Sequence, residues 1–539
     1  MRILLVNPPY LSITSVHGAG HQIPLGLLCV GGPLTDAGHE VSLLDAEALR
    51  LNQGQIAEHI RNCRPDIVMT GHAGSTPAHE VAVATLATAK SVDPAIRTVY
   101  GGPYPTYHGE DILAAEPAVD FIVSGEGEAI ARELVRTLAE GGNPADVRGL
   151  VLRLAGEPFR TPDAPAIRAL DDWRVGWELI DDWDRYQCFG LGRAAIVQFS
   201  RGCPHQCNYC GQYQFWERWR HRSPKLVVDE IEALHREHGI AFITLADENP
   251  TSSKKMWRAF LEELSSRRLP IRLFATLRAA DVVRDAEMLH LYRGAGLMCI
   301  LMGVETTDPE TLAAIRKGST TATDREAVRL LRQHGILSML GHIVGFEDER
   351  FGHYWRALRQ LFAYDPDLLN AMYVTPHRWS DWVVENAERR VIQTDRGKWD
   401  YRHQLLDTPH LKPWQVFALV KLMEVLVHCR PRALWRILRH EDDMTRRAMR
   451  WSFRRSARVW FAEVWEFMFA TQFARVPDSL RAWFRPAWKA AGAGRDEPIR
   501  IQPRVKVKVP QAPVSKPMAL GFEVEQVSRN KAGEVRPTV

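Results

Sequence analysis

The sequence predicts an α/β protein with two successive parallel sheets and a helical C-terminal region. Short apolar runs that end in glycine or polar residues alternate with stretches of helical spacing over about the first 400 residues. This alternation is typical of parallel strands joined by crossover helices. The chain has 539 residues, which is enough for three domains at roughly 150 residues each.

The first region, residues 1–150, has the pattern of a doubly wound, flavodoxin-like (Rossmann-type) sheet. Helices are expected at Leu25–Ala37 and Val81–Ser91, between the apolar runs. Ligands of such sheets bind outside the carboxyl ends of the strands, where this sequence places many glycines. The five expected strands are Arg2–Pro9, Val41–Asp45, Ile67–Gly71, Thr98–Gly102 and Phe121–Gly125.

A second series, residues 191–400, has the pattern of a partial (β/α) barrel. Its first expected strand, Ala194–Phe199, ends just before a cysteine-rich loop, and Pro224–His238 then has helical spacing. The chemistry of such barrels lies at the carboxyl ends of the strands. Further expected strands are Phe242–Ala246, Leu273–Thr276, Met298–Val304 and Gly341–Phe346, and further expected helices are Asp285–Arg293 and Ala322–His334.

The remaining segments are a linker over residues 151–190, a helical domain over 401–490 and a disordered tail over 491–539. The expected helices are Trp414–Cys429, Pro431–Arg439 and Thr445–Phe473. Aromatic residues at helical spacing in the last of these helices predict either a packed face or a pocket for a flat macrocycle, with nearby arginines meeting carboxylates. A peripheral membrane contact also fits such basic, aromatic helices. The aromatic residues are Trp451, Trp460, Trp465 and Phe469, and the arginines are Arg446, Arg450, Arg454 and Arg458.

Composition excludes several classes of function. A net charge of +4 is too small to argue for nucleic-acid binding, and no apolar run is long enough to span a bilayer. Eight cysteines without a secretory signal indicate reduced thiols rather than disulfides. We therefore expect a cytoplasmic protein, and the alternative is a cytoplasmic protein that associates with a membrane.

Cys203, Cys207 and Cys210 form a CxxxCxxC motif in one short loop. Three thiolates without a fourth nearby suit a [4Fe–4S] cluster whose fourth iron stays open for another ligand. Structural zinc sites usually have four protein ligands, so zinc would need His205 or Cys188 to complete its set. The spacing favours the cluster over zinc.

Charged residues follow the expected barrel strands. Asp247 and Glu248 end the second strand, Arg278 follows the third, and Glu305 follows the fourth. Each is either a ligand-binding residue at the carboxyl edge of the barrel or a helix cap or surface ion-pair partner. The position at the strand ends favours binding.

The cysteine spacing, with Tyr209 before the last cysteine, resembles the signature of the radical S-adenosylmethionine (SAM) superfamily. The resemblance implies that the open iron binds SAM and that reduction of SAM gives a 5′-deoxyadenosyl radical. It also implies that Tyr209 and Glu248 contact this cofactor, with Glu248 at the amino group, while Glu305 meets the ribose. Arg278 would pair with the carboxylate through a bidentate fork.

Gly101–Thr106 and Val123–Glu128 resemble the cobalamin-binding domain of the B12-dependent radical SAM class. The Asp-x-His-x-x-Gly motif of other cobalamin proteins is absent, because Thr70 stands where the aspartate would precede His72. His72 is therefore expected to line the cleft rather than to bind cobalt, and another ligand for this domain remains an alternative. The resemblance implies cobalamin contacts from Ser75, Gly102, Thr106, Gly125 and Glu126.

A narrower resemblance, over residues 1–380, is to the anaerobic magnesium-protoporphyrin IX monomethyl ester oxidative cyclases. It rests on Arg201–Pro204, Leu245–Thr251, Gly303–Glu305 and Ile343–Glu347, while Val16–Pro24 departs from the Trp- and Pro-rich loop of that family.

The narrower resemblance implies radical hydrogen abstraction from a magnesium porphyrin, oxidation of the carbon radical and capture by water. It also implies a reducing protein such as a ferredoxin or flavodoxin. The alternatives are a B12-dependent radical C-methyltransferase, acting on a tetrapyrrole or another substrate, and a cobalamin/iron–sulfur sensory protein.

Overall fold

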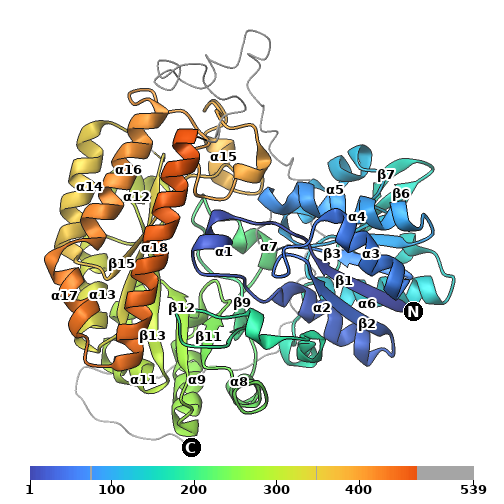
Figure 1. Cartoon of the computed structure of the whole chain (residues 1–539), viewed down its shortest axis with the longest axis horizontal. Coiled ribbons are helices and arrows are strands. Elements are labelled where there is room, and N and C mark those ends of the chain that lie inside the picture. The colour runs from blue at the N-terminus through green and yellow to red at the C-terminus, as the bar shows by residue number, and fades with distance from the viewer. Residues whose placement is uncertain (73–75, 347–348, 470–539) are drawn as a thin grey trace, which may run out of the picture. The chain divides into compact units, whose positions relative to one another are not determined.

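The computed structural model describes residues 1–72, 76–346 and 349–469 (Figure 1). Within these residues, a seven-stranded sheet has the order β2-β1-β3-β4-β5-β6-β7. Strands β1 to β5 are parallel, and β6 and β7 add an antiparallel hairpin at one edge. The strands are β1 (Arg2–Asn7), β2 (Glu40–Asp45), β3 (Ile67–Thr70), β4 (Arg97–Tyr100), β5 (Phe121–Val123), β6 (Leu150–Leu154) and β7 (Glu157–Arg160).

Helices cover both faces of this first sheet, as the doubly wound prediction requires (Figure 1). One face packs on α2 (Leu25–Asp36) and α6 (Gly127–Ala139). The other face packs on α3 (Gln53–Cys63), α4 (His79–Val92) and α5 (Pro103–Ala115). The inner strands β1, β3 and β5 are mostly apolar because both faces of a parallel sheet are buried, whereas the edge strand β2 is partly exposed.

The hairpin of β6 and β7 lies in residues that the sequence analysis assigns partly to a linker. Its turn is made by Ala155 (φ 50°) and Gly156 (φ 90°), and two consecutive positive φ angles are the mark of a type I′ turn. The usual signal for that turn is Asn-Gly or Asp-Gly, so an Ala-Gly pair gives little warning of a hairpin.

The second sheet contains, among the described residues, six parallel strands in the order β15-β14-β13-β12-β11-β8. Its end strands do not pair with each other, so the fold is the predicted partial barrel. The sixth strand, β15, was not predicted, because its sequence LLNAMY is short and has no clear alternation. The strands are β8 (Ala194–Val197), β11 (Phe242–Leu245), β12 (Arg272–Leu277), β13 (Leu297–Glu305), β14 (Leu337–Val344) and β15 (Leu368–Tyr373).

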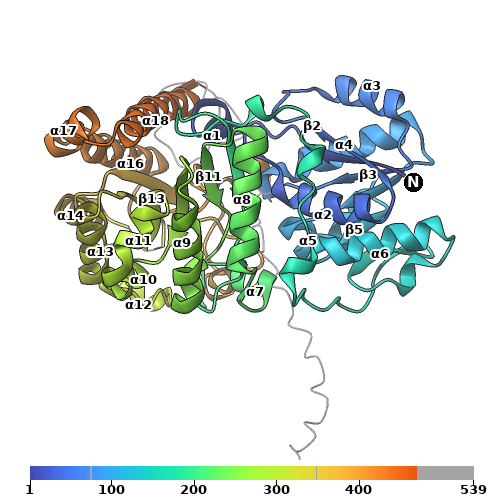
Figure 2. The same cartoon turned by 90° about the horizontal axis from the view of Figure 1, so that it is seen from below.

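Helices lie in an arc outside these strands (Figure 2). The predicted helix at Asp285–Arg293 is divided, because a 3₁₀ turn at Ala286–Met288 precedes α11. A short antiparallel pair, β9 (Ser200–Arg201) and β10 (Arg220–His221), brackets the cysteine loop. The helices are α8 (Pro224–His238), α9 (Lys254–Arg267), α10 (Ala279–Arg284), α11 (Leu289–Gly294), α12 (Pro309–Ala314), α13 (Thr321–Gln333) and α14 (Phe351–Tyr364).

Alternation along the strands separates the lumen of the barrel from its outer core. On β15, Leu369 and Ala371 are buried against the helices, whereas Asn370 and Met372 are half-buried. On β14, Ile343 is half-buried opposite Met372. The half-buried side chains fall on alternate positions, as expected for the face that looks into the lumen.

The C-terminal helices α16 (Pro413–His428), α17 (Pro431–Arg439) and α18 (Asp443–Phe469) pack beside the barrel (Figure 1). The aromatic residues of α18 do not gather around one pocket. Trp451 lies against Phe189, while Trp465 and Phe469 are 65% and 57% exposed. No helix in the described part of the chain is long and apolar enough to cross a membrane.

Candidate active site

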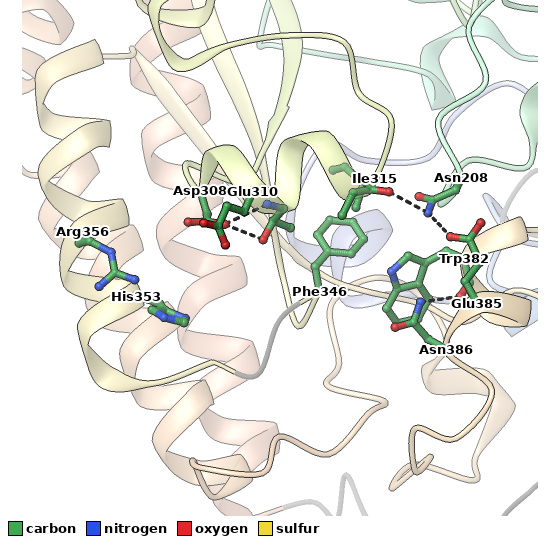
Figure 3. A pocket seen from close by; sticks show the side chains of 12 residues that line it. Asn208, Asp308, Glu310, Ile315, Phe346, His353, Arg356, Trp382, Glu385 and Asn386 are labelled. Atoms are coloured by element: carbon green, nitrogen blue, oxygen red, sulfur yellow. Dashed lines mark hydrogen bonds between the residues drawn. The ribbon is translucent and has the colours of Figure 1, made fainter.

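The cysteine loop runs from β9 to α7 (Gln212–Trp216) and is held at both ends. Gly202 opens it with φ 88°, and a Cβ there would lie 2.5 Å from the carbonyl oxygen of Arg218, so only glycine fits. Within the loop, Asn208 donates its backbone N–H to the carbonyl oxygen of Ile315 (3.2 Å) and its side-chain amide to Glu385 (2.6 Å; Figure 3). These anchors fix the three cysteines against the barrel.

The three thiols fit a cluster with one open iron. Burial raises the pKa of Cys203 and raises that of Cys210 to about 12. Binding of a metal by cysteine requires thiolates, so cluster binding would release their protons. In the part of the chain that the structure describes, no three His, Cys, Asp or Glu side chains are arranged around a single metal ion. In an iron–sulfur cube each cysteine binds its own iron, so its three ligands surround the cluster rather than one point.

Two acids after β11 support the entry to this loop. Glu248 accepts a hydrogen bond from the backbone N–H of Gly202 (3.0 Å), and burial raises its pKa. Asp247 accepts from the backbone N–H of Phe199 (3.0 Å) and from the hydroxyl of Ser200 (2.5 Å), and burial raises its pKa to about 7. Asp247 therefore fixes the backbone before the cysteines, while Glu248 lies beside the loop itself.

A triad at the end of β13 consists of the buried Glu305 and Lys317 and the half-buried Tyr209. The Tyr209 hydroxyl donates to Glu305 Oε1 (2.8 Å), and Lys317 Nζ donates to the same oxygen (2.6 Å). A bulge and a positive φ of 58° turn Glu305 back over the strand, where a Cβ on Gly303 would lie 2.0 Å from its carboxylate. Burial lowers the pKa of Lys317, but the Glu305 carboxylate outweighs it and raises that pKa above its ordinary value.

Arg278 joins this group from the end of β12. Its guanidinium lies against the ring of His205, within the cysteine loop, and donates to the carbonyl oxygen of Lys317 (2.5 Å). Burial, and then the charge of Arg278, lower the pKa of His205. The structure thus brings Tyr209, Glu248, Arg278 and Glu305 around the cysteine loop.

In the first sheet, Thr106 ties together two loops at the carboxyl edge. Its hydroxyl donates to the carbonyl oxygen of Gly102 (2.8 Å) and accepts from the backbone N–H of Gly125 (3.0 Å). Gly102 and Gly125 have φ angles of 108° and 103°, which favour glycine. Ser75, the other small residue predicted here, lies outside the described residues.

His72 lies at the same edge but is directed to a carboxylate. Its Nε2 is 2.9 Å from Glu47 Oε2, and His21 Nδ1 is 3.4 Å from the other oxygen of Glu47. Burial acts to raise the pKa of Glu47, but the two imidazoles outweigh it and lower that pKa to about 2. His72 therefore has a carboxylate partner at Nε2, and its expected place in a cleft stays a prediction.

Glu126 connects the first sheet to the cysteine loop. It accepts hydrogen bonds from Arg201 Nη1 (2.8 Å) and Arg220 Nη1 (2.6 Å), and Arg201 Nη2 also donates to Glu128 (2.5 Å). Arg201 is two residues before Cys203, and all of these side chains except that of Arg220 are at least 91% buried. Neither arginine was predicted as a partner of Glu126, because nothing local in the chain pairs them with it.

A second connection is aromatic. The ring of Trp379 stacks on Tyr107 of α5 (centroids 5.1 Å apart) and on His377 (4.6 Å). A Cβ on Gly211, the residue after Cys210, would lie 1.9 Å from the Trp379 ring. His377 also approaches Tyr401, whose hydroxyl is 2.8 Å from its Nε2. His377 and Trp379 were not predicted, because they follow β15, which was itself not predicted.

A cavity of about 530 Å³ lies behind the cysteine loop (Figure 3). Asn208, Phe346 and Trp382 line it together with charged side chains of α12, α14 and α15 (Asp381–Glu385). None of the predicted site residues line this cavity, so it is separate from the group around Glu305.

Comparisons with known proteins agree with this two-part site. Residues 197–361 match the radical SAM superfamily, and residues 12–135 match the B12 binding domain. The predicted cofactors, a [4Fe–4S] cluster, SAM and cobalamin, are confirmed by these two families. Among solved structures, the radical SAM methyltransferase TsrM from Kitasatospora setae has the same fold, with a TM-score of 0.65 and 18% identity over 85% of this chain and 99% of that one.

Two relatives named anaerobic magnesium-protoporphyrin IX monomethyl ester cyclase are similar over most of their length. The protein from Synechocystis sp. is 47% identical over 90% of this chain and 97% of its own. The one from Rubrivivax gelatinosus is 34% identical over 77% of this chain and 74% of its own. A hopanoid C-3 methylase from Methylococcus capsulatus is 28% identical over 79% of this chain and 80% of its own. The chain therefore belongs to the B12-binding radical SAM family that includes the anaerobic magnesium-protoporphyrin IX monomethyl ester cyclases.

Proposed function

We propose that this enzyme catalyses the anaerobic oxidative cyclisation of magnesium-protoporphyrin IX monomethyl ester, a step of bacteriochlorophyll biosynthesis. The observation that carries the proposal is the 47% identity to a cyclase over 90% of this chain and 97% of that relative. When bound, the cluster, SAM and cobalamin supply a 5′-deoxyadenosyl radical and one-electron or methyl-transfer chemistry.

In this proposal the chain itself binds and orients. Cys203, Cys207 and Cys210 hold the cluster, and Glu248 and Arg278 hold the amino and carboxylate groups of SAM beside it. Glu305 meets the ribose, and Lys317 and Tyr209 fix its carboxylate through the hydrogen bonds described above.

The carboxyl edge of the first sheet takes the cobalamin. Gly102, Thr106 and Gly125 offer close backbone approach to a large ligand, since Thr106 bonds both glycine loops. Glu126 acts through its ion pairs by holding the segment before Cys203. The domain limits proposed from the sequence are 1–150 for the first sheet and 191–400 for the barrel, and the hairpin of β6 and β7 extends the first sheet to Arg160.

The test is an anaerobic reaction with reconstituted enzyme, SAM, a reductant and magnesium-protoporphyrin monomethyl ester, followed by mass spectrometry. A product with solvent-derived oxygen or the closed fifth ring is expected. A gain of one methyl group would make the enzyme a C-methyltransferase, a candidate favoured by the hopanoid methylase relative. Absence of SAM cleavage by an intact cluster would favour a sensory protein.

Two further parts of the proposal concern partners. A small reducing protein, such as a ferredoxin or flavodoxin, would supply the electron for SAM cleavage. A cytoplasmic enzyme could meet its apolar substrate at a membrane, because exposed residues form one stripe along α18. The stripe has four arginines followed by apolar side chains: Arg447, Arg450, Arg454, Arg458, Phe461, Trp465 and Met468.

Such a helix face suits an anionic membrane surface. Co-sedimentation with vesicles of anionic or neutral lipid tests this contact. Binding only to the anionic vesicles, lost in a variant with Phe461→Ser and Trp465→Ser, is the expected result. Equal recovery with both lipids, or no effect of the double substitution, would remove the membrane from the proposal.

A further inference from the structure

Gly211, the residue after Cys210, is a glycine for a reason outside its own backbone. Its φ and ψ angles are −89° and −5°, a right-handed conformation that does not by itself favour glycine. A Cβ there would nevertheless lie 1.9 Å from Cδ1 and 2.3 Å from Nε1 of the Trp379 ring. The lack of a side chain at the end of the cysteine loop is therefore required by Trp379, whose indole edge lies directly on the loop backbone.

The same ring packs on helix α5 of the first sheet. Trp379 stacks on Tyr107 with ring centroids 5.1 Å apart and an interplanar angle of 18°, and it meets the ring of Tyr104 edge-on at 6.5 Å. It is half-buried against the apolar core that α5 shares with α3 and α4. Thr106 precedes Tyr107 and bonds both glycine loops of the carboxyl edge. One tryptophan thus joins the cysteine loop to the helix that carries the proposed cobalamin contact.

The segment around Trp379 holds the cysteine loop at two further points. The Trp382 backbone N–H donates to the carbonyl oxygen of Asn208 (2.9 Å), and Gln214 donates its side-chain amide to Asp381 Oδ1 (2.9 Å). These two loop residues lie on either side of the last cysteine in the chain. The end of the loop is therefore held by one segment, and Trp379 extends these contacts to the first sheet.

We propose that Trp379 is a positioning residue that fixes the end of the cysteine loop, and with it the cluster and SAM, relative to the cobalamin edge of the first sheet. The start of the loop has its own connection through Arg201 and Glu126, so both ends are tied to that sheet. The inference rests on the proposed function, because only a substrate that reacts at both cofactor sites depends on how those sites are placed. A displacement of about 1 Å between reacting groups can cost about 100-fold in rate.

The variant Trp379→Leu removes the ring, and Trp183→Leu is its matched control. Trp183 is also a stacked indole, 4.6 Å from the ring of His238, but it belongs to the apolar core that the barrel strands share with their helices. With wild type active, Trp379→Leu should assemble the cluster and form 5′-deoxyadenosine at a normal KM for SAM, but yield about 100-fold less cyclised product per 5′-deoxyadenosine. Trp183→Leu should keep the wild-type ratio. Trp379→Phe, which keeps a ring on Tyr107, should restore most of it.

The glycine gives an independent check on the same contact. Gly211→Ala alone should lower the ratio in the same way, because the added methyl group displaces the ring. In Trp379→Leu, where the ring is absent, adding Gly211→Ala should cause little further loss, because substitutions of residues in contact are not additive. Tyr107→Leu removes the partner on α5 and should reproduce the loss, so the inference stays testable where Trp379→Leu does not fold.

A distance measurement separates positioning from cluster assembly. Pulsed EPR of the reconstituted enzyme, with a reduced cluster and Co(II) cobalamin, should give a broader distribution of cluster–cobalt distances in Trp379→Leu than in wild type and Trp183→Leu. An unchanged distribution, or an unchanged ratio of product to 5′-deoxyadenosine, would overturn the inference. A loss of cluster that accounts for the whole loss of product would overturn it as well. If wild type does not cyclise the porphyrin but the distribution broadens in Trp379→Leu, the proposed function fails and the positioning role stands.

Discussion

Both sheets present a carboxylate at the carboxyl edge, but the surroundings of the two groups shift their pKa values in opposite directions. Glu47, after β2, lies between two imidazoles that lower its pKa to about 2. Asp247, after β11, meets backbone N–H groups and a hydroxyl in a buried site, and its pKa rises to about 7. The strand end determines where such a group lies, whereas its partners determine its charge.

The two edges also differ in what their charged groups do. At the barrel edge, Arg278, Lys317 and Glu305 gather around the cysteine loop. At the edge of the first sheet, Glu126 is occupied by arginines of the barrel region, and Gly102 and Gly125 have positive φ angles. The barrel edge thus gathers charged side chains, as the proposed SAM site requires, and the glycines allow the close backbone approach that the proposed cobalamin site requires.

The largest effect is expected from replacing Cys203, Cys207 and Cys210 together by alanine. Cluster assembly and all SAM cleavage should be lost, because no other described residues supply thiolates at this loop. Cobalamin binding, which belongs to the other sheet, should be retained. Iron analysis and cobalamin absorbance after gel filtration measure the two properties, and loss of both would show that the edges are not independent.

The next effect concerns the contact between the sheets. Arg201→Met leaves the buried Glu126 and Glu128 without their shared partner, so the free energy of unfolding should fall by about 3–5 kcal/mol. Urea unfolding checks this value. Arg136→Met on α6 is the matched control, because its two ion pairs are exposed and contribute little. Similar losses in both variants would contradict the special role of Arg201.

A smaller effect is expected at the glycine edge. Thr106→Val keeps the shape of the side chain but leaves the Gly125 N–H without its acceptor, at a cost of about 1–3 kcal/mol. Cobalamin affinity should fall while cluster content is unchanged. Thr137→Val on the neighbouring helix provides a control for the loss of a hydroxyl. Equal cobalamin affinity in Thr106→Val and wild type would remove Thr106 from the binding site.

A final difference between the two edges is expected in the pH dependence of stability. The pKa of Asp247 is raised from 3.8 to about 7, so its contribution to stability is present below pH 3.8 and is lost as pH rises through 7. The pKa of Glu47 is lowered from 4.5 to about 2, so its contribution is present above pH 4.5 and is lost as pH falls through 2.

Urea unfolding of Asp247→Asn and Glu47→Gln over this pH range compares the two groups. Asp247→Asn should flatten the decline in stability between pH 4 and 7, and Glu47→Gln should flatten the decline at lower pH. The same pH profile in both variants would show that the two carboxylates do not differ as described.

The sequence by itself determined the order of the two sheets, the cysteine loop and most strand ends. Apolar runs and helical spacing are local properties, so α8 has the predicted limits. Strands β8, β11 and β13 begin within one residue of their predicted starts. The rule that chemistry follows parallel strands placed Glu248, Arg278 and Glu305 correctly beside the loop.

Only the tertiary structure decided the partners of these groups. Lys317 follows a helix rather than a strand, and Arg201 meets Glu126 and Glu128 across more than 70 residues of sequence. Thr76 and His377 are 301 residues apart in the sequence and lie within hydrogen-bonding distance. His377 follows β15, a strand whose sequence has no strong alternation. The local sequence pattern determines which strand or loop carries a residue at the edge of a sheet. The charge and hydrogen bonds of a buried side chain, in contrast, depend on segments that the folded chain brings to it.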